Sequence, residues 1–151
     1  MRIVLDDLTG EDVVAFLDEH LADMRSASPP ESKHALDLEG LRRPEVTFWT
    51  VRQGGAIAGC GALKELSPRH GEIKSMRTSE AFRRRGVAAA LLRHIVDVAR
   101  QRGYARLSLE TGSMPFFAPA RALYGKFGFE PCAPFDGYCE DPNSVYLTRE
   151  L

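Results

Sequence analysis

The stretch that decides the fold is Arg83-Arg84-Arg85-Gly86-Val87-Ala88, a basic turn built around one glycine. It follows a strand-like run, Ile73 to Thr78, and precedes apolar residues at helical spacing, which are Val87, Leu91, Ile95 and Val98. A helix N-terminus offers unpaired N–H groups and a partial positive charge, and Gly86 has no Cβ to hold an anion away. The order of strand, glycine turn and helix therefore predicts a binding site for the pyrophosphate of a nucleotide-type cofactor.

A second motif lies further along the chain and makes the first one more specific. It reads Ala120-Arg121-Ala122-Leu123-Tyr124-Gly125-Lys126-Phe127-Gly128-Phe129. With both motifs in this order, the sequence resembles the GNAT acetyltransferase superfamily. The acetyl-CoA loop of that superfamily reads Q/R-x-x-G-x-G/A, and its later helix commonly ends in A-x-x-L-Y-x-x-x-G-F.

Length and composition limit the function classes. The chain has 151 residues, 44% hydrophobic and 27% charged, which fits one domain spanning residues 1–151. A net charge of −1 gives no support for nucleic acid or an anionic membrane as a partner. The sequence shows no signal-peptide core and no membrane-spanning run, so a cytoplasmic location is expected. Three cysteines without a C-x-x-C pair argue against disulfides and a metal site, and Cys60 is expected to be a packing residue.

The predicted elements alternate along the whole chain. Helices are expected after a capping-box pattern at Thr9 and Asp12, from Pro29 through Leu41, from Val87 to Gly103, and around Tyr124. This order predicts an α/β (α+β) protein with helices on both faces of a mixed sheet. The resemblance implies the GNAT fold, with a mostly antiparallel sheet of about seven strands. The seven predicted strands are Arg2–Asp6, Val46–Arg52, Ala56–Glu65, Glu72–Thr78, Arg106–Glu110, Phe129–Cys132 and Ser144–Arg149.

The resemblance also implies where acetyl-CoA, the expected co-substrate, is held. The amides of Arg84 to Ala89 would hold the pyrophosphate, and the pantetheine arm would pair with the backbone at Met76 and Thr78. The amide of Met76 is then the expected oxyanion donor, and Tyr124 the donor to the leaving sulfur. No metal is expected. The predicted cofactor-binding residues are Met76, Arg77, Thr78, Arg83, Arg84, Arg85, Gly86, Val87, Ala88, Ala89 and Tyr124.

An amine acceptor must lose a proton before it attacks, so a base or a chain of waters is needed. Glu72 is the first candidate, because some protein-lysine acetyltransferases of the superfamily present a glutamate four residues before the position of Met76. Strand alternation predicts that Glu72, Lys74 and Met76 share one face, while Arg77 joins Lys74 only if a bulge intervenes. Glu110, at the end of the next strand, is the competing base, and water could link either carboxylate to the amine. Alternatively, Glu72 would only form an ion pair with Lys74 or Arg77 at the sheet surface.

The resemblance places the acceptor pocket between two segments, Ser28–Leu38 and Phe135–Asn143. The roles of His34 and His70 are left open between substrate contact, proton relay and plain solvation. Many family members have an asparagine near the position of Phe117, where this chain reads Met114-Pro115-Phe116-Phe117. The two phenylalanines would either wall the acceptor channel or fill the core.

The expected function is therefore that of an acetyl-CoA-dependent N-acetyltransferase. It would move the acetyl group to a primary amine of a small molecule or amino-acid-like acceptor, by direct attack in a ternary complex. Acetylation of a protein N-terminus or lysine is the alternative among enzymes, and a non-catalytic acyl-CoA sensor is the alternative of another class. The sequence leaves the oligomeric state open, with a homodimer as one option.

Overall fold

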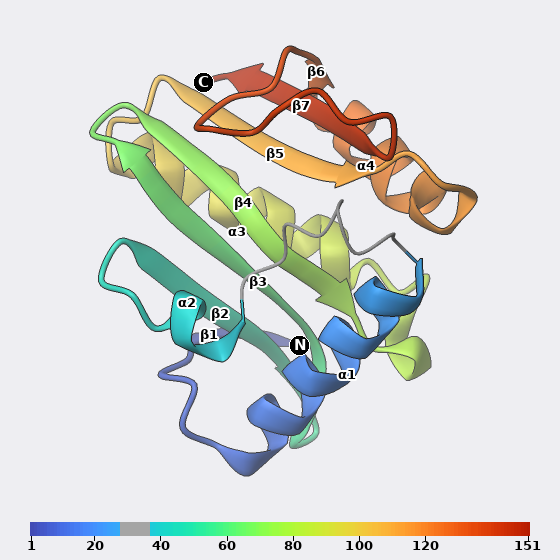
Figure 1. The fold of residues 1–151 in the computed structure, drawn as a ribbon. Coiled ribbons are helices and arrows are strands. Elements are labelled where there is room, and N and C mark those ends of the chain that lie inside the picture. The colour runs from blue at the N-terminus through green and yellow to red at the C-terminus, as the bar shows by residue number, and fades with distance from the viewer. Residues whose placement is uncertain (28–36) are drawn as a thin grey trace.

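A sheet of seven strands, in the order β1-β2-β3-β4-β5-β7-β6, forms the centre of the computed structural model, which describes residues 1–27 and 37–151 (Figure 1). Of these strands, β4 and β5 pair in parallel and the other neighbours pair antiparallel. The predicted mixed, mostly antiparallel sheet is confirmed. Its strands are β1 (Arg2–Leu5), β2 (Val46–Gln53), β3 (Ala56–Ser67), β4 (His70–Thr78), β5 (Arg106–Gly112), β6 (Glu130–Pro131) and β7 (Ser144–Glu150).

Helices cover both faces of the sheet, as predicted. The helices are α1 (Glu11–Ala27), α2 (Leu38–Leu41), α3 (Val87–Gln101) and α4 (Ala118–Lys126). On one face α3 and Tyr124 of α4 form a core with the side of the sheet that carries Trp49 of β2. On the other face α1 and α2 pack against the side that carries Phe48. Because neighbouring residues of a strand point to opposite faces, Phe48 and Trp49 serve the two separate cores.

The start of α1 corrects the predicted capping box. The Thr9 hydroxyl donates to the Asp7 carboxylate at 2.6 Å instead of capping the helix, and the first helical bond runs from the Val14 amide to the Gly10 carbonyl. Asp12 bonds the Val13 amide and Arg52. The side chain of a short polar residue before a helix can bond a neighbouring residue instead of the helix amides. Here the Thr9 hydroxyl bonds Asp7, so it does not cap α1.

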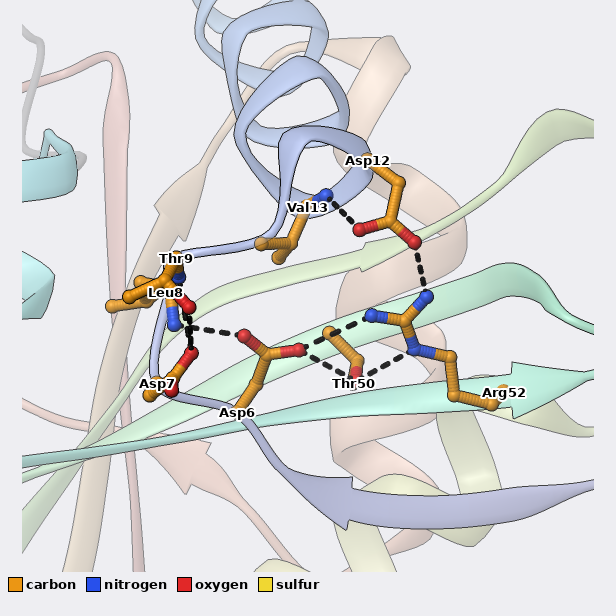
Figure 2. A network of polar contacts seen from close by, with 8 residues as sticks. All are labelled: Asp6, Asp7, Leu8, Thr9, Asp12, Val13, Thr50 and Arg52. Carbon is orange, nitrogen blue, oxygen red and sulfur yellow. Dashed lines mark hydrogen bonds and ion pairs between the residues drawn. The ribbon is translucent and has the colours of Figure 1, made fainter.

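Arg52 of β2 ties this helix start to the sheet (Figure 2). Its guanidinium pairs with Asp12 of α1 on one side and with Asp6, 3.3 Å away, on the other. The Thr50 hydroxyl also donates to Asp6, at 3.2 Å. The first turn of α1 is therefore held at a fixed place over the β1–β2 edge.

The predicted helix from Pro29 through Leu41 lies partly outside the described residues. The part that is described is the single turn α2, which Asp37 caps by accepting from the Gly40 amide at 2.8 Å. The remaining predicted elements are present, and their ends lie within a few residues of the predicted ones. Small differences are expected, since the ends of helices and strands commonly shift by one or two positions.

A substitution at Gly112, the last residue of β5, would test how tightly the end of this strand is packed. A Cβ at this position would lie 2.1 Å from the ring of Phe117, so we expect Gly112→Ala to lower the free energy of unfolding by about 1–3 kcal/mol. Gly125→Ala is the matched control: nothing lies within 4 Å of its Cβ, so its higher helix propensity should stabilise α4 by roughly 0.5–1 kcal/mol. Urea unfolding measures both, and equal effects of the two substitutions would contradict the packing argument.

Candidate active site

The turn before α3 has the geometry of an anion cradle. Arg84 and Gly86 both adopt left-handed backbone, with φ of 64° and 78°. The amides of residues 84–89 donate to no backbone or side-chain acceptor elsewhere in residues 1–27 and 37–151, and the first bond of α3 is donated by Ala90. Six consecutive unpaired N–H groups at a helix N-terminus fit a phosphate or pyrophosphate.

The side chains of this turn add positive charge. Arg83, Arg84 and Arg85 are exposed, and within the described part of the chain none of them forms an ion pair with a carboxylate. The Arg85 guanidinium stacks over the Phe82 ring at 5.5 Å from its centre. The predicted cofactor loop is therefore a basic surface with open space over Gly86.

The strands β4 and β5 separate beside this loop. They pair from His70 with Arg106 to Ile73 with Leu109, and no further, although β4 continues to Thr78 and β5 to Gly112. Figure 1 shows the two arrowheads diverging toward α4 and the C-terminal end of α1. Backbone groups at Met76 and Thr78 thus lie on a strand edge without a β5 partner, where an extended ligand could pair.

A bulge at Ser75 corrects the predicted alternation. Ser75 has a left-handed φ of 57°, and the register of β4 against β3 shifts between Lys74 and Arg77. Met76 therefore packs on the α3 face, against the space over Gly61, and does not share a face with Glu72 and Lys74. The extra residue in the strand reverses the alternation beyond it.

The same bulge brings Arg77 to the face of Lys74, which is the condition stated from the sequence. The Arg77 guanidinium pairs with Asp23 of α1 at 2.5 Å and with Glu19 at 3.6 Å. Its plane also lies over the Phe16 ring, at 5.5 Å from the centre. Arg77 therefore fastens the C-terminal half of α1 to the sheet.

Glu72 is buried in a polar network. Its carboxylate is 2% exposed and lies 3.1 Å from the Lys74 ammonium. The Tyr138 hydroxyl donates to Glu72 at 2.6 Å and accepts from Lys74 at 2.9 Å. Burial and the Glu72 charge raise the pKa of Tyr138, so this phenol stays protonated. Glu72 pairs with Lys74, one of the partners considered from sequence, but in the interior and not at the surface.

A cavity of about 90 Å³ lies where β4 and β5 part. It is lined by Glu110 of β5, Tyr124 of α4, and residues of α1 and β4. Burial raises the pKa of Glu110 to about 7. Burial, followed by the Glu110 charge, raises the pKa of Tyr124, and its hydroxyl has no hydrogen-bond partner in the described part of the chain. The predicted donor and the competing base thus face one small space.

His20 of α1 also lines this cavity and was not predicted from the sequence. It is 7% exposed and continues the buried stripe of Val13 and Leu17, at positions i, i+4 and i+7. That spacing was the available signal: a histidine on the apolar stripe of an amphipathic helix. Burial, and then the charge of Arg77, lower the pKa of His20 to about 4.

Of the remaining sequence candidates that the structure describes, Phe117 lines the cavity, and His70 and Phe116 do not. His70 bonds the Ser108 hydroxyl at 2.7 Å and packs on Phe135, and His34 lies outside the described residues. Phe117 is buried and lines the cavity, whereas Phe116 is 53% exposed.

Cys60 is sealed in the core beneath α1. Its thiol donates to the Ser75 carbonyl at 3.2 Å, and burial raises its pKa to about 12. Within residues 1–27 and 37–151, no grouping of three or more histidine, cysteine, aspartate and glutamate side chains could hold a metal ion. The helices of this part of the chain are all too short or too polar to cross a membrane.

Three comparisons with known proteins agree with this geometry. The model of the Acetyltransferase (GNAT) family matches residues 13–129. YsnE of Bacillus subtilis (strain 168), named an uncharacterized N-acetyltransferase, is 61% identical over 151 residues, with both chains fully covered. The IAA acetyltransferase of Azospirillum brasilense is 38% identical over 89% of this chain and 86% of its own. The crystal structure of a Bacillus subtilis acetyltransferase in complex with CoA shares the fold, with a TM-score of 0.70, 21% identity and coverage of 99% and 98%.

A matched pair of glycines tests the anion cradle. Gly86 and Gly103 have φ of 78° and 82°, and nothing lies within 4 Å of either Cβ, so valine strains both backbones alike. We expect Gly86→Val to weaken coenzyme A binding at least about tenfold, because its side chain enters the phosphate cradle. Gly103→Val, at the far end of α3, should keep the affinity. Calorimetry measures both, and unchanged binding by Gly86→Val would refute the assignment.

Proposed function

We propose which class of acceptor this chain uses and which of its residues catalyse the transfer. The chain belongs to the acetyltransferase (GNAT) family and is an acetyl-CoA-dependent N-acetyltransferase. In the proposed reaction, a primary amine of a small molecule attacks the thioester carbonyl directly, within a ternary complex. The new bond joins nitrogen to the acetyl carbon, the carbon–sulfur bond breaks, and the thiolate leaves. The observation that carries the proposal is the cavity shared by Glu110, Tyr124 and the unpaired edge of β4.

The size of the cavity supports a small acceptor. The cavity volume of about 90 Å³ is well below the roughly 300–1,000 Å³ of pockets that take drug-sized ligands. That space suits the reacting amine and a few neighbouring atoms. The name of the Azospirillum relative, IAA acetyltransferase, also denotes a small molecule as its substrate.

Glu110 is the proposed general base. A base works best when its pKa is close to the working pH, and burial places the pKa of Glu110 at about 7. The ionised carboxylate would take a proton from the acceptor ammonium, directly or through one water. Glu72 is less suited to this step, because Lys74 and Tyr138 already engage its Oε2 atom.

Tyr124 is the proposed donor to the leaving sulfur. Its raised pKa keeps the phenol protonated throughout the reaction, so it can donate a hydrogen bond to the thiolate without losing its proton. The amide of Met76, on the unpaired edge of β4, is the proposed donor to the developing oxyanion. This assignment uses the backbone of Met76, so the turn of its side chain toward α3 does not affect it.

Direct transfer is supported by the placement of the cysteines. Cys60 is fully buried with a raised pKa, and Cys132 and Cys139 are not among the residues that line the cavity. A thiol must ionise and reach the thioester to carry the acetyl group. In the described part of the cavity, no cysteine thiol is therefore available to accept the acetyl group and form an acetyl-cysteine intermediate.

Coenzyme A release from acetyl-CoA tests the proposed function. We expect turnover with a panel of small primary amines and little with lysine-containing or N-terminal peptides, as the proposed small-molecule acceptor requires. Initial rates at several fixed amine concentrations should give intersecting double-reciprocal lines, as a ternary complex requires. Binding of acetyl-CoA without release by any amine would favour the sensor alternative, and preferred turnover of peptides would favour the protein acetyltransferase.

The pH dependence of kcat/KM identifies the base. If ionised Glu110 is required, the rate is low below its pKa and rises with pH through about 7. We expect Glu110→Gln to lower kcat/KM by about 10²-fold or more at pH 8 and to remove this rise. Glu72→Gln is the matched control and should retain the rise of kcat/KM with pH. The opposite result, loss of the rise only in Glu72→Gln, would return the role to Glu72.

A further inference from the structure

Arg121 belongs to the second sequence motif, and the proposed function gives it no role. Its side chain extends from α4 and donates from Nη1 to two backbone carbonyls, that of Gly112 at 2.7 Å and that of Met114 at 3.0 Å. Within the described part of the chain it forms no ion pair with a carboxylate, and it is not among the residues that line the cavity. The Arg121 guanidinium therefore holds backbone beside the cavity.

The two carbonyls belong to segments that lead into the cavity wall. Gly112 is the last residue of β5, and Met114 directly precedes the short turn Pro115–Phe117. The Met114 carbonyl also accepts from the Phe117 amide, at 3.0 Å. One guanidinium thus joins β5, this turn and α4. Each of the three supplies one residue of the cavity wall, and these are Glu110, Phe117 and Tyr124.

The position of α4 depends on such contacts, because the helix is short. It has nine residues, and a helix of this length is stable only when it packs on the rest of the protein. Its N-cap residue, Phe117, makes no side-chain capping bond. Toward the C-terminal end, the Tyr124 ring packs against Phe129, with 5.8 Å between the ring centres. In the N-terminal half, the Arg121 bonds tie the helix to the end of β5.

Arg121 and Tyr124 lie three positions apart on α4, so their side chains leave the same side of the helix. Tyr124 is the buried residue of α4 and lines the cavity. A tilt or rotation of the helix that displaces Arg121 therefore also moves the Tyr124 hydroxyl within the cavity. Such a movement matters for transfer, since a misplacement of about 1 Å can lower a reaction rate on the order of 10²-fold.

From this arrangement we infer that Arg121 is a positioning residue, which locks the start of α4 to the end of β5 and thereby sets where the Tyr124 hydroxyl meets the leaving sulfur. The inference rests on the proposed function, in which Tyr124 is the donor. Arg121 acts through Tyr124 and makes no contact of its own with the reacting atoms. Its loss therefore slows the transfer step and spares cofactor binding, because the phosphate cradle lies at the start of a different helix, α3.

Methionine at position 121 removes both hydrogen bonds and keeps a long side chain. We expect Arg121→Met to lower kcat about ten- to a hundredfold, with little change in the KM for acetyl-CoA or the Kd of coenzyme A. Arg121→Lys should restore most of the lost kcat, because both bonds come from one nitrogen and an ammonium has three N–H donors. Arg42→Met is the matched control and should keep kcat: Arg42 also donates to a carbonyl, that of Leu8 at 2.6 Å, and neither residue lines the cavity.

A double-mutant cycle with Tyr124→Phe tests whether Arg121 acts through Tyr124. If it does, Arg121→Met costs little once the hydroxyl is gone, and the double variant has nearly the kcat of Tyr124→Phe alone. Two independent effects that multiply would overturn the inference, and so would a wild-type kcat in Arg121→Met. Urea unfolding verifies the fold of each variant, and Arg121→Gln takes the place of Arg121→Met in the cycle if the apolar variant does not fold.

Fluorine NMR of protein labelled with fluorotyrosine keeps this inference distinct from the proposed function. The Tyr124 resonance is identified by its loss in Tyr124→Phe. In the complex with coenzyme A, Arg121→Met should shift this resonance, Arg121→Lys should return it, and Arg42→Met should leave it in place. If it shifts in this way but Tyr124→Phe keeps full turnover, the donor role of Tyr124 fails and its placement by Arg121 stands. If it does not shift and only Tyr124→Phe lowers turnover, the inference is overturned and the proposed function stands.

Discussion

The site depends on the end of pairing between β4 and β5 after Ile73 and Leu109. Up to that point the two strands satisfy each other's backbone groups; beyond it, each leaves an edge that something else must satisfy. On β5 the Arg121 side chain meets this need, since it donates to the carbonyls of Gly112 and Met114 at 2.7 and 3.0 Å. On β4, no described strand pairs with the edge beyond Ile73, and the cavity lies beside this edge.

The bulge at Ser75 decides which side chains reach the cavity. Without it, Met76 would share the face of Glu72, and Arg77 would point toward α3. With it, Arg77 pairs with α1 and Met76 fills the α3 core. A left-handed serine costs roughly 1–3 kcal/mol, and the ion pairs and packing on the two faces hold it in place. Strain of this size commonly accompanies a functional site.

The sequence allowed much of the fold and the cofactor loop to be predicted, because the signals are local. The helical stripe after Gly86, the strand alternation and the glycine turn each depend on neighbours a few residues apart. The bulge was not predicted, because the run around Ser75 contains no glycine to mark it. Its one local trace is that the apolar residues Ile73 and Met76 are three positions apart, so a regular strand would place them on opposite faces. Tyr138 gave no local signal, because its bond to Glu72 joins residues 66 positions apart. His20 was overlooked because only apolar residues were counted on its stripe.

Two arginines from the sheet hold α1 at its two ends. Arg52 of β2 pairs with Asp12 near the first turn, and Arg77 of β4 pairs with Asp23 near the last (Figure 2 shows the first of these). The carboxylates of both pairs are partly exposed to solvent, at 53% and 40%, so dissolved ions can screen them. Charge screening does not weaken the apolar contacts between these two anchors. High ionic strength would therefore loosen the ends of α1 without detaching it, and the wall that carries His20 would become more adaptable while the sheet beneath stayed rigid.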